Sequence, residues 1–232
     1  MAMASVMLPL GTPASPFSLR DVVSGQFYSL DSFAGKTALL VMFICRHCPY
    51  VEHVEHELAK IGQDYTDTGL AIIGISSNDP VQYPDDAPPR LKEMAERLGF
   101  TFPFCFDETQ EVAMAYGAAC TPDFYLFDRE RRLVYRGQLD DSRPGSNKPV
   151  TGRDLRAAID AVLAGKPVDS KQRASVGCSI KWKRPQSSPL VPVLTQRGSR
   201  SPLSRRQSAT IEERTSVEGK EALVLDGAHA AW

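Results

Sequence analysis

One stretch of the chain combines a buried strand, a pair of cysteines and the start of a helix. It reads Leu39-Leu40-Val41-Met42-Phe43-Ile44-Cys45-Arg46-His47-Cys48-Pro49. The continuous apolar run before Cys45 is typical of a strand that is buried on both faces. After Pro49, apolar residues recur at helical spacing with charged residues between them, and proline is well tolerated in the first helical turn. The stretch therefore predicts a strand-to-helix junction that carries both cysteines.

The residues around this junction alternate between strand and helix patterns. Apolar runs bounded by turn residues predict strands at residues 25–30, 70–76, 102–106, 123–127 and 133–137. Amphipathic spacing and end signals predict helices at about residues 49–61, 90–98, 109–116 and 151–165. This order predicts an α/β fold with a mixed central sheet, helices on both faces and an N-terminal hairpin.

Composition separates the chain into two parts. Its 232 residues are 42% hydrophobic and 24% charged, which suits a domain with a buried core, and we place that domain at residues 1–182. Residues 183–232 form a basic tail rich in serine, arginine and proline. Because the tail cannot bury enough apolar surface to fold, we expect it to be disordered apart from a short helix near residues 210–225.

Charge and hydropathy also limit the classes of partner that the sequence allows. The net charge of −1 gives no basic field for nucleic acid. No stretch approaches the ~18 consecutive apolar residues of a membrane span, and the first residues lack the cationic region of a secretory signal. We therefore expect a cytoplasmic protein without nucleic-acid or membrane partners, in which paired cysteines are catalytic or metal-binding rather than structural.

The motif Cys45-Arg46-His47-Cys48 is the candidate centre of the chemistry. Unpaired N–H groups and the positive dipole end at a helix N-terminus stabilise a thiolate, and the cationic Arg46 and titratable His47 are expected to tune it. We expect Cys45 to be the nucleophile and Cys48 the resolving thiol that attacks the mixed disulfide. Exchange of this kind implies no metal and no organic cofactor.

Thr121-Pro122 is the second candidate element, directly before the predicted strand at residues 123–127. A proline here fits the start of a strand, and we interpret it as a cis-proline placed opposite the cysteine pair. The exposed backbone beside it can pair with an extended peptide that carries the target disulfide. Thr121 and Pro122 are therefore expected to shape the substrate groove.

The other three cysteines are possible accessory thiols or core residues. Cys120 adjoins Thr121, where it is either a redox thiol or a small residue packed beneath the site. Cys178 follows the last predicted helix and can resolve a disulfide only if its segment folds back over the site. Cys105 lies among aromatic residues and is expected in the core.

These motifs together resemble the thioredoxin-like redoxin superfamily, in its alkyl-hydroperoxide-reductase and thiol-specific-antioxidant (AhpC/TSA) group. More narrowly, the chain is similar to peroxiredoxin-like bacterial proteins that keep a C-x-x-C motif. The resemblance covers about residues 6–182. Besides the cysteine and Thr-Pro motifs, it rests on residues 30–36 (LDSFAGK), 83–86 (YPDD), 107–113 (DETQEVA), 116–124 (YGAACTPDF), 135–145 (YRGQLDDSRPG) and 177–182 (GCSIKW). It implies a thioredoxin fold with redox-active cysteines at Cys45 and Cys48.

Departures from the family pattern decide between activities. The slots that hold proline and threonine before a peroxidatic cysteine hold Ala38 and Met42 here, and residues 120–122 replace the later arginine. The slot of the buried acid of thioredoxins holds Leu39, so an obvious proton acceptor for Cys48 is missing. Dithiol–disulfide exchange is therefore favoured over peroxidase activity.

Three functions stay open at this level. The first is a thiol–disulfide oxidoreductase that takes electrons from a thioredoxin-like dithiol protein or glutathione and acts on a disulfide-bearing protein. The second is an antioxidant thiol peroxidase that uses Cys45 against a peroxide. The third is a copper- or zinc-handling protein with ligands from the cysteine pair and His47, His53 or His56, although a structural zinc site normally takes four ligands.

Overall fold

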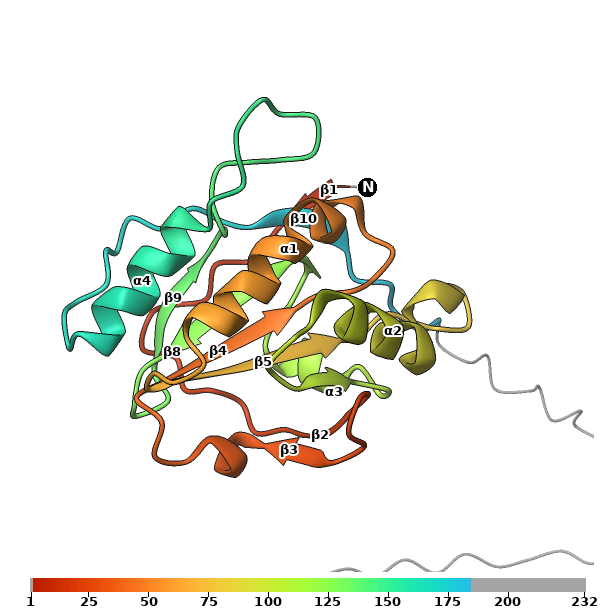
Figure 1. Ribbon diagram of the computed structural model, residues 1–232, viewed down its shortest axis with the longest axis horizontal. Helices are drawn as coiled ribbons and strands as arrows, with labels where there is room; N and C mark the ends of the chain where they lie inside the picture. The colour runs from red at the N-terminus through yellow and green to blue at the C-terminus, as the bar shows by residue number, and fades with distance from the viewer. Residues whose placement is uncertain (1, 185–232) are drawn as a thin grey trace, which may run out of the picture. The chain divides into compact units, whose positions relative to one another are not determined.

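A seven-stranded sheet with the order β3-β2-β6-β5-β4-β8-β9 forms the centre of the computed structural model, which describes residues 2–184 (Figure 1). The parallel neighbours are β4–β5 and β5–β6, and the other pairs are antiparallel. The strands are β2 (Ser18–Asp21), β3 (Phe27–Ser29), β4 (Ala38–Phe43), β5 (Leu70–Ser76), β6 (Phe104–Phe106), β8 (Asp123–Phe127) and β9 (Leu133–Gly137). The sheet is mixed, as the sequence predicted.

Helices cover both faces of this sheet. Side chains alternate along β4, so Leu40 and Met42 join one apolar cluster while Leu39 and Val41 join another. The first cluster is closed by α1, α2 and α4, which lie in front of the sheet in Figure 1, and the second by α3. The helices are α1 (Pro49–Asp64), α2 (Pro88–Leu98), α3 (Glu111–Ala115) and α4 (Arg153–Leu163).

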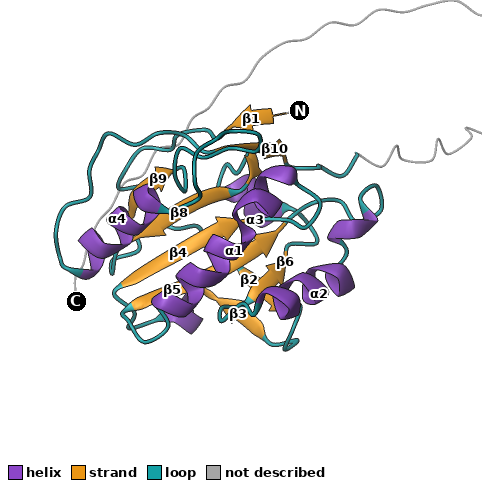
Figure 2. Ribbon diagram, turned by 45° about the horizontal axis from the view of Figure 1, so that its top comes forward, coloured by secondary structure: helices purple, strands orange, loops and turns teal. Residues whose placement is uncertain are grey.

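A second, small sheet has the order β1-β10-β7 and was not predicted. It joins β1 (Ala2–Ala4), β10 (Val176–Ser179) and the two-residue β7 (Cys120–Thr121), all antiparallel. Both ribbon views place β1 and β10 together near the start of α1 (Figures 1 and 2). The segment of Cys178 therefore does fold back toward the predicted cysteine site.

Other expectations from the sequence have mixed outcomes. The N-terminal hairpin is confirmed as β2–β3, and the strands at residues 123–127 and 133–137 have the predicted bounds. Within residues 2–184, no helix is both long and apolar enough to cross a lipid bilayer. The expected tail and its short helix lie outside the described residues, so the domain boundary stays a prediction.

Candidate active site

The cysteine motif occupies the turn between β4 and α1, and its sulfurs are buried. Cys45 is 1% exposed and Cys48 is 0% exposed. The helix begins at Pro49, and Cys48 is its N-cap in an extended conformation (φ −90°, ψ 121°), because the residue before a proline avoids helical geometry. The sequence placed Cys45 at the helix N-terminus; in the structure that position belongs to Cys48.

Thr121 joins the two cysteines from the opposite side of the site. Its hydroxyl lies 3.1 Å from Cys45 Sγ, and its carbonyl oxygen lies 3.2 Å from Cys48 Sγ, where it can accept a hydrogen bond from the protonated thiol. The Thr121–Pro122 bond is cis, which confirms that prediction. The structure thus brings together Cys45, Cys48, Thr121 and Pro122, four of the residues that the sequence proposed for the site.

The surroundings push the pKa values of the two cysteines in opposite directions. Burial raises the pKa of Cys45 well above its usual value, and its hydrogen bond to Cys48 and the charge of Asp86 raise it further. The pKa of Cys48 falls to about 5, chiefly because the Cys45 thiol donates to its sulfur, with help from Cys178 and the backbone N–H of Val51. The reduced pair therefore favours a proton on Cys45 and a thiolate at Cys48.

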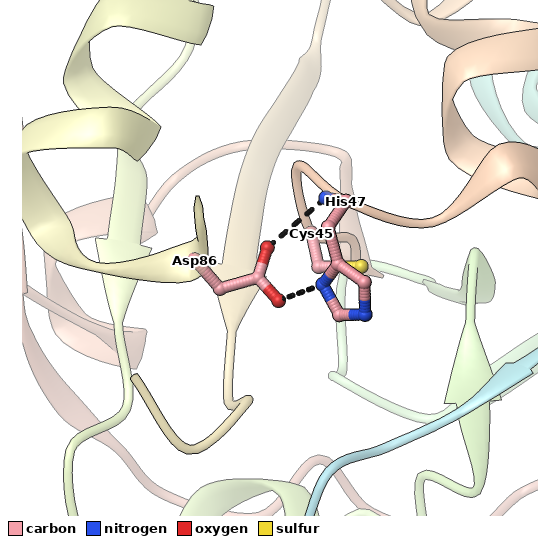
Figure 3. A group of neighbouring side chains, drawn as sticks. All are labelled: Cys45, His47 and Asp86. Carbon is pink, nitrogen blue, oxygen red and sulfur yellow. Dashed lines mark hydrogen bonds and ion pairs between the residues drawn. The ribbon is translucent and has the colours of Figure 1, made fainter. Parts of the chain in front are cut away.

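Asp86 fixes the backbone of the cysteine loop from the other side. Its carboxylate is fully buried and accepts hydrogen bonds from Arg46 N (2.8 Å), His47 N (3.2 Å) and Asn78 Nδ2 (2.7 Å). His47 Nδ1 bonds the same carboxylate (Figure 3), and the His47 ring stacks on Tyr83 at 4.9 Å between centroids. These bonds raise the pKa of His47 and, against the effect of burial, lower the pKa of Asp86.

Arg46 and His47 were predicted to lower the pKa of the Cys45 thiol. The Arg46 guanidinium instead lies 3.6 Å from Asp85 and 3.8 Å from Glu93, both exposed acids, and His47 is bound by Asp86. The lowered pKa lies on Cys48, because burial dominates at Cys45. The predicted roles of nucleophile and resolving thiol stay predictions.

Cys45, His47 and Asp86 also meet one geometric requirement of the metal alternative. One donor atom from each lies within 4.8 Å of the others (Figure 3). Thiolate, imidazole and carboxylate are suitable zinc ligands. In this arrangement, however, the His47 and Asp86 donor atoms bond each other, and both Asp86 oxygens serve the loop. The cluster is assembled as a hydrogen-bond network that holds the cysteine loop.

The remaining cysteines divide between site and core. Cys178 is half-buried and packs against the cluster that contains Cys45 and Cys48. Cys120 is fully buried, lies 3.8 Å from Pro122 O, and burial raises its pKa, as expected for a small packed residue. Cys105 is buried in the cluster on the other face of the sheet, and burial raises its pKa to about 12.

Two acids near the motif were missed from the sequence. Asp86 lies in a loop rich in proline and aspartate. The sequence pattern there does not indicate that Asp86, rather than its neighbour Asp85, is buried. Asp123 follows Pro122 on β8 and pairs in register with Phe43, one strand away from the expected slot at Leu39. It is fully buried against Arg136 (3.0 Å), and burial raises its pKa to about 7.

Comparison with known proteins is consistent with this geometry. The family model described as AhpC/TSA matches residues 10–136, which include the cysteine motif and Thr121-Pro122. The chain belongs to the AhpC/TSA family. It is also 55% identical to an uncharacterized conserved protein from Geobacillus kaustophilus of known crystal structure. That match has a TM-score of 0.77 and covers 79% of this chain and 97% of the other.

Two further relatives carry names that refer to redox chemistry. The thiol-disulfide oxidoreductase ResA of Geobacillus thermodenitrificans is 27% identical over 126 residues, which are 53% of this chain and 66% of that protein. The chain thus spans just under two thirds of this curated relative. The thioredoxin domain of a thiol-disulfide oxidoreductase from Bacteroides vulgatus matches 68% of this chain and 99% of that domain. Its TM-score of 0.52 at 22% identity supports the thioredoxin fold.

Proposed function

We propose that the protein is an oxidoreductase that exchanges dithiols and disulfides through Cys45 and Cys48. The observation that carries the proposal is the placement of the two cysteines. Both are buried at a strand-to-helix junction, and the same threonine contacts both sulfurs. A thiolate is the species that attacks a disulfide, so a pair with one strongly lowered pKa suits this reaction.

The opposite pKa shifts of the two cysteines suggest a proton path for the reaction. As Cys45 attacks a substrate disulfide, its proton passes to the Cys48 thiolate. The first sulfur of the substrate is released as a thiolate, and the second forms a mixed disulfide with Cys45. Cys48 then transfers the proton to that leaving thiolate and attacks Cys45, which releases the second substrate sulfur. The substrate gains two electrons and the pair becomes a disulfide. Cys48 is thus the proton acceptor for Cys45, and the leaving substrate thiolate accepts the proton of Cys48, for which Leu39 offers no acceptor.

The test is turnover of two disulfide substrates, insulin and oxidised glutathione, by the full chain with a dithiol reductant. We expect Cys45→Ser and Cys48→Ser to lose activity with both substrates. Cys105→Ala is the matched control, because this cysteine is buried on the other face of the sheet. Rates for Cys45→Ser equal to those of the wild type with both substrates would contradict the proposal.

A second candidate, thiol peroxidase, is favoured by one specific contact. The Thr121 hydroxyl lies 3.1 Å from Cys45 Sγ. It supplies a hydroxyl beside the sulfur, which the family pattern takes from a threonine at the position of Met42. Against it, Ala38 and Met42 are fully buried, and Arg46 is directed to surface acids. Consumption of hydrogen peroxide by the reduced protein no faster than by a free thiol would remove this candidate.

The partners follow from the chemistry of the exchange. The reduced pair would be regenerated by a thioredoxin-like dithiol protein or by glutathione. Its oxidant would be a disulfide-bearing protein or a small disulfide. The cytoplasmic location expected from the sequence stays a prediction.

A further inference from the structure

The strand β10 lies along the backbone that the sequence assigned to a peptide substrate. It pairs antiparallel with β7, and the paired residues are Cys178 with Thr121 and Ser179 with Cys120. The edge beside Pro122 is therefore already occupied by the chain itself. A cysteine of β10 stands opposite the threonine that contacts both sulfurs of the pair.

Side-chain directions aim Cys178 at the cysteine pair. Residues directly opposite each other in an antiparallel ladder project to the same side, and the Thr121 hydroxyl lies 3.1 Å from Cys45 Sγ. Cys178 packs against the cluster that contains both cysteines. Hydrogen bonding from the thiol and the backbone N–H of Cys178 also helps to lower the pKa of Cys48. Three thiols thus converge at Thr121.

The docking of β10 is built into its sequence. A Cβ on Gly177 would overlap the carbonyl oxygen of Thr121, so only glycine permits this approach. On either side, the Ser175 hydroxyl donates to a carbonyl of β9 (2.8 Å) and Ile180 N donates to Ala119 O (3.1 Å). Close backbone contact at one residue, with hydrogen bonds before and after it, holds Cys178 in place.

We propose that Cys178 is a third redox thiol of this site, which takes the disulfide from the Cys45–Cys48 pair by bonding to Cys48. This inference rests on the proposed exchange function. In the step, the Cys178 thiolate attacks Cys48 Sγ, the Cys45–Cys48 bond breaks, and the Cys48–Cys178 bond forms. Cys45 leaves as a thiolate and takes up the proton that Cys178 lost. No electrons enter or leave the protein.

The step would make β10 an internal counterpart of the substrate strand. Cys45 becomes a free thiol again while the oxidation is held between Cys48 and Cys178. Extended peptides must displace β10 before they can pair with Thr121, whereas small disulfides need no such pairing. The site is accordingly expected to prefer small disulfides to protein disulfides.

Peptide mapping of the full chain tests the step directly. Trypsin cleaves after Arg46, Arg173 and Lys181 among other sites, so Cys45, Cys48 and Cys178 fall on three separate peptides. Cys45→Ser is oxidised with oxidised glutathione, which takes up the two electrons released when one protein disulfide forms. We expect the peptides of Cys48 and Cys178 to be recovered as a linked pair.

Two variants separate docking from the mere presence of the thiol. In the Cys45→Ser background, Gly177→Ala retains Cys178 but displaces β10, so we expect the linked pair to be lost. Ser179→Ala on the same strand is the matched control and should retain it. Failure to link Cys48 to Cys178 in Cys45→Ser, or equal linkage in Gly177→Ala, would overturn the inference.

The proposed function has its own readout in the same samples. A Cys45–Cys48 link in the oxidised Cys178→Ser variant, together with turnover of oxidised glutathione, supports exchange by the pair whatever Cys178 does. Absence of that link and of turnover would refute the exchange function without reference to β10.

Discussion

The two ends of the Cys45–Cys48 loop lie in different surroundings. At the Cys45 end, the loop backbone is bound to the buried carboxylate of Asp86, and His47 completes the network. At the Cys48 end, the sulfur faces the start of α1 and the thiols of Cys45 and Cys178. One end is held by a fixed negative charge, and the other faces hydrogen-bond donors, with the Thr121 carbonyl oxygen also 3.2 Å from its sulfur.

This difference explains why two cysteines three residues apart have opposite pKa shifts. Burial, together with the charge of Asp86, disfavours a thiolate at Cys45, whereas donors and a helix N-terminus favour one at Cys48. The Cys45 end, through Asp86, positions the loop. The Cys48 end, which faces α1 and β10, carries the negative charge of the thiolate. Motif spacing alone does not reveal which cysteine carries the thiolate.

The largest effect we expect is in the titration of the reduced thiols. Followed by ultraviolet thiolate absorbance, the wild type should show one thiolate with a pKa near 5, far below that of a free cysteine. Cys48→Ser should lose this transition. Cys45→Ser should largely retain it, because the serine hydroxyl can still donate to Cys48. Loss of the transition in Cys45→Ser but not in Cys48→Ser would reverse the comparison.

The next effect concerns the polar end of the loop. Asp86→Asn leaves His47 without its buried partner, so we expect a loss of about 3 kcal/mol in the free energy of unfolding. The raised pKa of His47 stabilises the fold fully below its unfolded value near 6.5, and this contribution disappears as pH rises through the folded value. The lowered pKa of Asp86 adds stability that is lost in acid.

Urea unfolding of the wild type and Asp86→Asn at several pH values measures this contribution. The difference between the two proteins should be greatest in mildly acidic solution and should shrink as pH rises through the raised pKa of His47. Asp85→Asn is the matched control, since its carboxylate is exposed. A difference that still grows as pH rises through the His47 pKa would contradict the assigned ion pair.

The smallest effect is expected for Arg46, which the sequence analysis predicted to tune the thiolate. Arg46 pairs with exposed Asp85 and Glu93 at 3.6 and 3.8 Å, and such surface pairs contribute about 0.5 kcal/mol or less. Arg46→Ala should therefore leave the thiolate pKa and the unfolding free energy nearly unchanged. If the thiolate pKa in Arg46→Ala rose to that of a free cysteine thiol, Arg46 would be the residue that tunes it.

The sequence predicts the parts of this molecule that have strong local patterns. Continuous apolar runs identified β4 and β5, and Pro49 marked the start of α1. The strand β10 could not be found in this way, because Val176-Gly177-Cys178-Ser179 is short and contains a glycine, and its partner β7 has two residues. Its position depends on long-range contact with Thr121. The role of Asp86 depends on long-range contact with the cysteine loop. Neither contact leaves a local pattern in the sequence.

A redox titration against mixtures of reduced and oxidised glutathione tests the central claim most directly. At each ratio, free thiols are alkylated and the tryptic peptides are analysed by mass spectrometry. We predict a reversible two-electron transition in which the peptide of Cys48 becomes linked to that of Cys45 or of Cys178, while Cys105 and Cys120 stay reduced. Free Cys45 and Cys48 at every ratio, or disulfides that join neither of them, would contradict dithiol–disulfide exchange at this site.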